Sequence, residues 1–468
     1  MNNKFKRTLL IGMAVITMVM TACQKVDSSF NSNYSSFNSN FSSGPTTSYP
    51  NSNLKKASKL LRSPEGLDHK YSYEDISSPE YLAFKEKIKA FSSKLSEAFV
   101  KDSYTSGKNL TFSPLSVELC LGLAVRSAKG QTRQEMLDAF GVDYETFNKY
   151  YKLFYNENNK VFLNEEDKYQ GEISLTNSIW IDDEVTLKEE GLDALQNDYY
   201  CYSYETDFNH NNEGANLAIK EFINEKTKGL INPDLKLSDY TVFILMNTLY
   251  MKDMWSRLGD ELEYAPIDYK FTNSNGLKSD KRLLSGNYTS GKVLVTDDYS
   301  SFYASTAHGI KIHFIKPNNN KSLLDVFSKE NINYVLDSNN YTYQDDDKKE
   351  EYYTKCIFPS FEVETSIELK EMMQRDIGIN LFFSDSCDFS NLSPFSVKCD
   401  SLLHIAKLIV DKKGTEGAAV TIMEMTPTSM PYEPYKRVYD TFSVDQEFGY
   451  VLSYNDTVLF SGVVTNID

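Results

Sequence analysis

The sequence predicts an α+β fold in which helices come first along the chain and strands dominate the later part. Apolar residues recur at helical spacing from Phe84 to Phe99. Runs rich in β-branched and aromatic residues lie between residues 292 and 316 and again after residue 402. A final pair of such runs flanks Asn455 and Asp456. Helices followed by strands, rather than the two in alternation, is the order typical of α+β proteins.

Capping residues mark several of the expected helices. Ser113 is placed to cap a helix that begins at Pro114, where the missing N–H of proline costs nothing. Thr132 with Glu135 three residues later has the form of a capping box, and Gly141 is the expected end of that short helix. Helices are expected at about residues 79–100, from 114 onward, from 132 to 141, and at about 213–228 and 366–377.

Strands are expected where short apolar runs lie between turn signals. They cover about residues 172–180, 242–251, 356–364 and 402–411, three runs between 292 and 316, and the pair around 455–456. The charged stretch from Asp345 to Glu351 is expected to be a solvated loop.

The charge balance excludes two classes of partner. A formal net charge of −17 and a pI near 4.9 argue against nucleic acid. No cluster of lysine and arginine follows the first few residues, so a basic patch for an anionic membrane surface is not expected either. Length alone would allow about three domains at ~150 residues each.

The N-terminus has the pattern of an export signal. Three basic residues among the first seven precede an apolar run from Leu9 to Ala22, which is too short to span a membrane as a helix. Cys23 follows, and the arrangement resembles a bacterial lipoprotein signal, whose cleavage would leave Cys23 as an acylated first residue. An ordinary signal peptide cut near Ala22 is the alternative. The Ser/Asn-rich segment 27–53 cannot bury enough apolar area to fold and is expected to be a tether.

The remaining cysteines and the histidines form no familiar catalytic or metal-binding motif. His308 and His313 are five apart in an expected strand, so they would face opposite sides and not form a metal pair. A phosphate-loop spacing that ends at Lys292 is followed by Val293 where Ser or Thr would have to bind magnesium. No Gly-x-Ser-x-Gly elbow is present. We expect no metal and no cofactor; no motif supports hydrolase chemistry, and we do not expect an enzyme.

The five cysteines after Cys23 include no CxxC pair. Buried thiols are expected, although an exported chain could pair two of them. They are Cys120, Cys201, Cys356, Cys387 and Cys399.

Residues 414–431 have the pattern of a strand together with features that oppose strand formation. One parity is free of charge, whereas Glu416 and Glu424 fall on the other, so one face could be buried with both carboxylates in water. The segment begins with glycine and alanine, and it ends with Pro427 and Pro431, which cannot donate to a ladder. This conflict predicts a segment with two states. The uncharged parity consists of Thr415, Gly417, Ala419, Thr421, Met423 and Met425.

Several sequence blocks resemble those of the serpin family in order and spacing. The most specific runs from His404 to Thr421 and is similar to the strand and hinge that lead into the serpin reactive loop. The others are residues 109–117 with 128–133, residues 247–255, residues 358–361 with 388–390, and residues 458–463. The resemblance spans about Ser78 to Asp468. It implies one serpin domain over 78–468, with helices packed around a large central β-sheet, further sheets and an exposed reactive loop, after a signal peptide (1–22) and a lipidated tether (23–77).

The resemblance implies a serine protease inhibitor that acts as a suicide substrate. In this family a protease cleaves the exposed loop, and the hinge then inserts into the central sheet as a new strand while the protease is still attached as an acyl-enzyme. The resemblance places the reactive bond at Thr428-Ser429. No lysine or arginine lies between Gly414 and Tyr435, so elastase-like or subtilisin-like proteases fit better than trypsin-like ones.

The family pattern also assigns residues within the sheet. Ser113, Ser116, Asn247 and His404 match a polar cluster under the centre of the sheet, where two strands part to admit the loop; such groups can be hydrogen-bonded in both arrangements. Taken singly, Ser113 could be only a helix cap and His404 only a buried core histidine. Lys252 and Trp255 resemble positions at the top of the sheet, where insertion begins; simple aromatic packing is the alternative for Trp255.

The hinge itself matches residues 414–421, with two departures from the family pattern. These residues are Gly414, Thr415, Glu416, Gly417, Ala418, Ala419, Val420 and Thr421. Lys412 stands where the family usually has an acid, and Gly417 replaces a usual alanine, which costs about 1 kcal/mol or less in strand form. Both departures favour the rival possibility, a non-inhibitory serpin that serves as a surface binding or scaffold protein.

The expected partners and location follow from these assignments. We expect a monomer that forms a covalent complex with a target serine protease and is held at a membrane by an N-terminal lipid. The protein would be an exported cell-surface lipoprotein of a bacterium, or secreted if the tether is cleaved.

Overall fold

The computed structural model describes most of one compact unit, Lys55–Asp468. The described residues are 57–64, 71–164, 168–255, 260–318, 320–395, 397, 399, 401–415 and 435–467.

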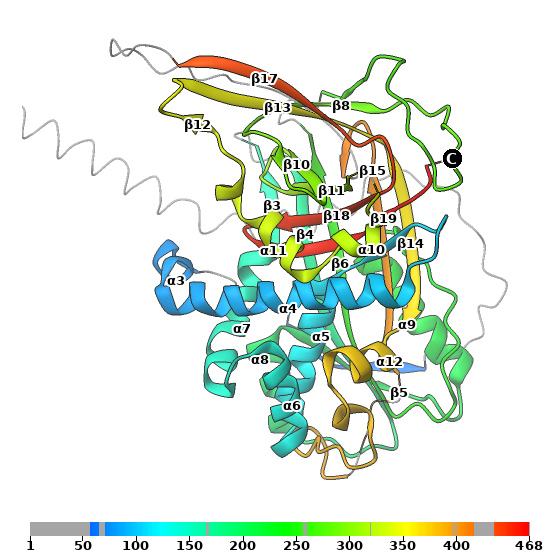
Figure 1. The fold of residues 1–468 in the computed structure, drawn as a ribbon. Coiled ribbons are helices and arrows are strands. Elements are labelled where there is room, and N and C mark those ends of the chain that lie inside the picture. The colour runs from blue at the N-terminus through cyan, green and yellow to red at the C-terminus, as the bar shows by residue number, and fades with distance from the viewer. Residues whose placement is uncertain are drawn as a thin grey trace, which may run out of the picture. The chain divides into compact units, whose positions relative to one another are not determined.

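The helices gather in the first half of the chain, as predicted (Figure 1). α4 (Pro79–Ser103) is capped by Ser78, and α5 (Pro114–Ser127) is capped by the Ser113 hydroxyl, which accepts a hydrogen bond from Ser116 N. α6 (Gly130–Phe140) ends at Gly141 with φ of 71°, a left-handed conformation that glycine adopts without strain. The other helices are α3 (Tyr73–Ser77), α7 (Tyr144–Asn158), α8 (Glu189–Tyr199), α9 (Asn212–Lys226), α10 (Leu323–Val326), α11 (Lys329–Leu336) and α12 (Lys370–Met372).

Two helix predictions were wrong. α6 begins at Gly130, before Thr132, and no side chain caps it. The Thr132 hydroxyl instead accepts a hydrogen bond from Asp388 N at 2.9 Å, and the Glu135 carboxylate accepts one from Leu381 N at 2.7 Å. The predicted helix over 366–377 begins too early, because β14 (Phe361–Glu368) continues through Ser366. Long-range partners decided both outcomes, and local patterns do not report them.

The central sheet has the order β1-β5-β4-β6-β16, and β3 adds to β4. Its longest ladder is the antiparallel pair β4 and β6, from Glu172 opposite Lys252 to Ile181 opposite Phe243. The predicted strands 172–180 and 242–251 are these two strands, slightly longer than expected. The strands are β1 (Ser58–Arg62), β3 (Lys160–Leu163), β4 (Tyr169–Asp182), β5 (Cys201–Thr206), β6 (Phe243–Met254) and β16 (Gly414–Thr415).

A second sheet, of order β2-β19-β18-β11-β10-β9, contains the predicted terminal hairpin. Asn455 and Asp456 both have positive φ, of 45° and 64°, as a two-residue turn between twisted strands requires. The strands are β2 (Leu110–Phe112), β9 (Leu294–Val295), β10 (Tyr299–Ser305), β11 (Lys311–Pro317), β18 (Phe448–Tyr454) and β19 (Thr457–Val464).

A third sheet joins β12, β13, β8 and β7, with β17 parallel to β13 along its length (Figure 1). Its strands are β7 (Glu263–Tyr264), β8 (Leu284–Ser290), β12 (Gln344–Asp345), β13 (Glu350–Phe358) and β17 (Lys436–Ser443). The prediction of one strand over 356–364 was wrong: β13 ends at Phe358 and β14 starts at Phe361, with Pro359 between them. The charged stretch 345–351 was only partly a loop, since both of its ends pair between β12 and β13.

The core lies between α4, α5 and the sheets. Phe99 of α4 stacks on Phe112 of β2 with ring centroids 4.6 Å apart. A separate apolar cluster forms under α9, where Trp180 of β4 stacks on Tyr204 of β5 at 4.1 Å. In the described part of the chain, no helix is both long and apolar enough to cross a membrane.

Candidate functional site

One edge of β6 forms no ladder beyond β16 within the described residues, so the central sheet stands apart from the β14–β15 pair; this arrangement is called the parted sheet below. β15 (Leu403–Val410) pairs over its full length with β14 and, within the described residues, forms no ladder with β6. A cavity of about 460 Å³ is lined by residues 243–249 of β6 and 403–407 of β15, together with residues of α5, α9 and the segment 235–242. Within the described residues, two strand edges that no ladder covers therefore face one space, which is the condition for adding another strand.

The predicted hinge begins at the C-terminal end of β6, which is here called the upper end of the sheet. β16 pairs antiparallel with β6, with Gly414 opposite Met254 and Thr415 opposite Asp253. A Cβ added to Gly414 would lie 2.1 Å from the Asp253 carbonyl oxygen, so only glycine allows this approach. Thr415 is 1% exposed, and its hydroxyl donates to the Asp253 carbonyl oxygen at 3.2 Å. The predicted hinge residues 416–421 and the predicted reactive bond Thr428-Ser429 lie outside the described residues, as does Cys23.

Three members of the predicted polar cluster lie together. Ser113 N donates to His404 Nε2 at 3.1 Å, and the Ser113 hydroxyl accepts from Ser116 N at 3.2 Å. His404 is on β15 and its ring lies 4.9 Å from that of Phe112. Burial lowers the pKa of His404 to about 4, so the ring is neutral at pH 7 with its proton on Nδ1.

Asn247 lies across the cavity from His404. Its amide donates to Asn177 Oδ1 on β4 at 2.9 Å, and Asn177 in turn donates to Tyr151 and to the Tyr199 carbonyl. The Asn247 Oδ1 atom is buried and has no hydrogen-bond partner within the described residues. A buried acceptor without a donor costs about 1–3 kcal/mol. The parted sheet therefore holds an unsatisfied group that an added strand could reach.

Trp255 and Lys412 hold the turn that leads into the hinge. The Trp255 indole donates to the Asp411 carbonyl at 2.7 Å, and the Trp255 amide donates to the Lys413 carbonyl at 3.3 Å. Position 412, where an acidic residue was expected from the family pattern, is a lysine. Its Nζ atom lies 3.1 Å from a Glu261 carboxylate oxygen and 4.8 Å from the centroid of the Tyr264 ring. Both members of the ion pair are partly exposed, so the pair contributes about 0–1 kcal/mol.

Lys252 is partly buried and lies on the parity of β6 opposite to that of Leu249 and Met251, across from Glu172 of β4. It is next to Asp253, which belongs to the parity that faces the core. Lys252 is only partly buried and is available to a strand added along the β6 edge.

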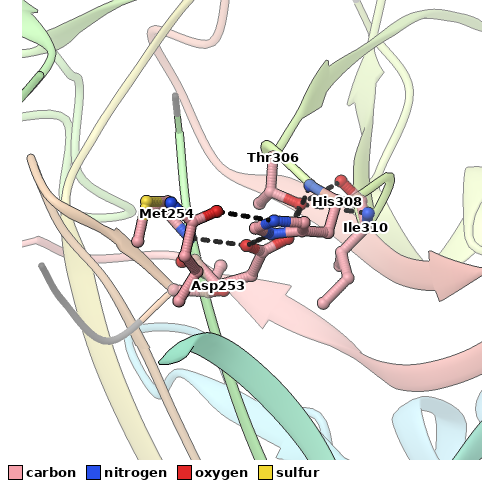
Figure 2. Close-up of polar contacts among 7 residues, drawn as sticks. Asp253, Met254, Thr306, His308 and Ile310 are labelled. Carbon is pink, nitrogen blue, oxygen red and sulfur yellow. Dashed lines mark hydrogen bonds and ion pairs between the residues drawn. The ribbon is translucent and has the colours of Figure 1, made fainter. Parts of the chain in front are cut away.

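The sequence pattern did not predict a contact between a buried carboxylate and an imidazole beside the predicted hinge. Asp253 is fully buried, and its carboxylate lies 2.7 Å from His308 Nδ1 (Figure 2). The premise that His308 lies in a strand was wrong, since it stands in the turn before β11. One signal was available: Asp253 is a charged residue on the same parity as the core residues Leu249 and Met251.

The five cysteines among the described residues are buried free thiols. Cys120, Cys201 and Cys356 are buried free thiols, and burial raises the pKa of each. Cys387 and Cys399 are also buried, and their thiols donate to the Val397 and Ser401 carbonyls. Among the described residues, no group of three His, Cys, Asp or Glu side chains is placed to hold a metal ion.

The fold agrees with comparisons to known proteins. The sequence profile of the serpin family, described as serine protease inhibitors, matches residues 86–467, so the chain belongs to the serpin family. The family is described as one of serine protease inhibitors, and its membership marks the chain as not an enzyme.

Relatives span much of the chain at low identity. Alpha-1-antitrypsin 1-1 of Mus musculus is 26% identical over 355 residues, which cover 73% of this chain and 80% of the relative. Alpha-1-antiproteinase of Rattus norvegicus is 24% identical over 369 residues, 76% of this chain and 83% of the relative.

Solved structures show the same fold. Serpin48 of the insect Tenebrio molitor has a TM-score of 0.66 at 19% identity and covers 84% of this chain and all of its own. The thermophilic serpin tengpin in its native state has a TM-score of 0.65 at 20% identity, and the match covers 82% of this chain and 95% of tengpin.

Proposed function

We propose that this protein inhibits serine proteases as a suicide substrate, by cleavage of its reactive loop and insertion of the hinge into the central sheet. The observation that carries the proposal is the parted edge between β6 and β15, with Gly414 and Thr415 already paired at its upper end. A protein that never adds a strand would gain no stability from two strand edges without ladder partners on either side of a cavity.

The register of β16 supports further insertion. Each later hinge residue would lie opposite the residue one step back along β6, so residues 416–425 would pair with residues 252–243 over about 33 Å at ~3.3 Å per residue. The uncharged parity of the hinge then faces the core. The next core-facing positions of β6 are Met251 and Leu249, followed by Asn247.

Two polar groups would gain partners in the inserted state. Glu416 would lie opposite the partly buried Lys252, an opposite-charge pair of about 0.2–1 kcal/mol. Thr421 would lie opposite Asn247, close to the amide oxygen that has no hydrogen-bond partner among the described residues. Insertion would thus relieve a buried unsatisfied group.

The target class follows from the loop sequence. With Thr428-Ser429 as the reactive bond, the residue before the cut is small and neutral, which suits elastase-like or subtilisin-like enzymes. An acidic specificity pocket would find no cation between Gly414 and Tyr435.

The test is to mix the protein with an elastase-like protease and analyse the products on a denaturing gel. Inhibition predicts a covalent complex that survives denaturant, and mass spectrometry should find a released peptide that begins at Ser429. Simple cleavage, with full protease activity remaining, would instead support a non-inhibitory binding or scaffold protein.

The site of action is a separate proposal. The N-terminal pattern that ends at Cys23 supports export and a lipid anchor, with residues 23–77 as tether and the serpin domain over 78–468 outside the membrane. Cleavage of the tether would release the domain.

A further inference from the structure

The end of β6 that receives the hinge is fastened to another sheet by the carboxylate of Asp253. This carboxylate accepts hydrogen bonds from the Thr306 hydroxyl at 2.5 Å and from His308 N at 3.1 Å, in addition to its contact with His308 Nδ1 at 2.7 Å (Figure 2). Next to it, the Met254 carbonyl accepts from Ala307 N at 2.7 Å. The turn between β10 and β11 therefore holds β6 through four contacts over two residues.

His308 connects this turn to two further strands. Its Nε2 atom lies 3.0 Å from Gln170 Oε1 of β4, and its ring stacks on Phe162 of β3 with centroids 4.7 Å apart and planes inclined by 5°. The side chain is 10% exposed. One imidazole thus joins β3, β4 and β6 at the place where the hinge begins to pair.

Thr415 depends on the backbone of the same aspartate. The Asp253 carbonyl oxygen accepts the Thr415 hydroxyl, and the same oxygen lies so close to Gly414 that no Cβ fits there. The contact between β16 and β6 is therefore tight, and a small displacement of Asp253 would separate the two strands. A buried carboxylate with several donors is a rigid anchor, because moving it leaves charge unpaired.

We propose that Asp253 and His308 are positioning residues for reactive-loop insertion. They hold the upper end of β6 in the place where Gly414 and Thr415 can pair, so that each cleaved loop begins to insert before the acyl-enzyme is hydrolysed. This inference rests on the proposed inhibitory function and adds two residues to it. Neither residue would contact the protease or the scissile bond.

The experiment uses Asp253→Asn and His308→Gln in the full chain, with two readouts. The first is the stoichiometry of inhibition, the number of inhibitor molecules consumed per protease molecule inactivated. We expect it to rise several-fold in each variant while the rate of loop cleavage stays within twofold of the parent. The second is hydrogen exchange of the peptide that contains Gly414 and Thr415, which should lose protection before any protease is added.

Two matched controls separate positioning from general destabilisation. His313→Gln removes a buried histidine farther along β11, whose Nε2 lies 3.3 Å from Ser453. His210→Gln removes an exposed histidine that lies 3.6 Å from Asp207. Both controls should keep the parental stoichiometry and hinge protection, even where thermal stability falls. The double variant Asp253→Asn/His308→Gln should be no worse than the worse single variant, because the two residues act as one unit.

The outcomes are distinct. Unchanged hinge protection in both variants, or lost protection with unchanged stoichiometry, would overturn the positioning role while the inhibitory function stands. A parent protein that is cleaved and forms no complex would instead overturn the proposed function and this inference with it. Because His308 is partly exposed, its variant keeps the test decisive if Asp253→Asn fails to fold.

Discussion

Thr415 lies opposite Asp253 at the upper end of the central sheet, buried, with its hydroxyl on the Asp253 carbonyl oxygen at 3.2 Å. The first two residues of the predicted hinge are thus already part of the sheet, and the space below them is lined in part by β6 and β15. A strand that has begun to pair needs no new nucleation to continue.

Thr415→Arg should convert the inhibitor into a substrate. Residue 415 is 1% exposed, and an unpaired charge there would have to be buried at a cost of several kcal/mol. A protease should still cut the loop, but the covalent complex on a denaturing gel should fall at least tenfold. Glu424→Arg places the same charge on the opposite parity and should largely keep the complex. Equal yields from the parent and Thr415→Arg would refute burial of this side chain during inhibition.

Reversing the charge of Lys252 should impair inhibition, and reversing the charge of Glu416 as well should restore it. Lys252→Glu would face Glu416 in the inserted state and should raise the stoichiometry of inhibition, by up to a few fold for a pair of about 0.2–1 kcal/mol. Glu416→Lys in the same chain should restore it. Partition between complex and cleaved product, measured at low salt, provides the comparison. Failure of the second change to compensate the first would mean that the register observed at Thr415 does not extend to residue 416.

Thr428→Arg should redirect inhibition toward trypsin-like proteases. An arginine before the cut fits an acidic specificity pocket, whereas the hinge is unchanged. Second-order inhibition rates for a trypsin-like and an elastase-like enzyme should change in opposite directions, each by tenfold or more. Met425 and Met430 are competing sites for chymotrypsin-like enzymes. Stable complexes whose released peptide begins elsewhere than Ser429 would move the reactive bond without affecting the family assignment.

Glu118→Gln should remove a pH dependence of stability. Burial raises the pKa of Glu118 to about 8, and a 2.5 Å bond from the Ser92 hydroxyl opposes this only in part. The folded chain therefore keeps a proton that the unfolded chain loses near pH 4.5, so stability falls as pH rises from about 4.5 to 8. At pH 9 the variant should be more stable than the parent, by at most on the order of 5 kcal/mol, and at pH 5 nearly equal.

Thermal unfolding of both proteins between pH 5 and pH 9 measures this effect. Glu86→Gln is the control, because Glu86 lies on the surface of α4 in a pair with Lys89. Parallel pH curves for the parent and Glu118→Gln would show that Glu118 is not protonated in the fold.

Cys23→Ala should release the protein from membranes. If the lipid is attached at Cys23, the variant has no anchor and should move to the soluble fraction, since no other lipid site is predicted. Immunoblots of membrane and soluble fractions give the result. A variant that remains as membrane-bound as the parent would rule out lipidation at this cysteine.

Local sequence patterns correctly predicted the helix ends and the turn that depend on neighbouring residues. Ser113 and Pro114 marked the start of α5, Gly141 the end of α6, and Asn455-Asp456 the terminal turn. These succeed because capping and turn geometry depend on a few neighbouring residues. Thr132 failed for the opposite reason: its hydroxyl serves Asp388, which is 256 residues away.

The sequence by itself determined the family, the two-faced character of the hinge and the absence of familiar catalytic motifs, because these depend on residue type and spacing. Only the tertiary structure decided that β6 and β15 form no ladder and that Lys412 pairs with Glu261. It also decided that Asp253 contacts His308 beside Thr415. These relationships join residues from distant parts of the chain, and their geometry follows from how the sheets pack. A charged residue on the core parity of β6 hinted at a partner, but the partner itself lies in a turn 55 residues away.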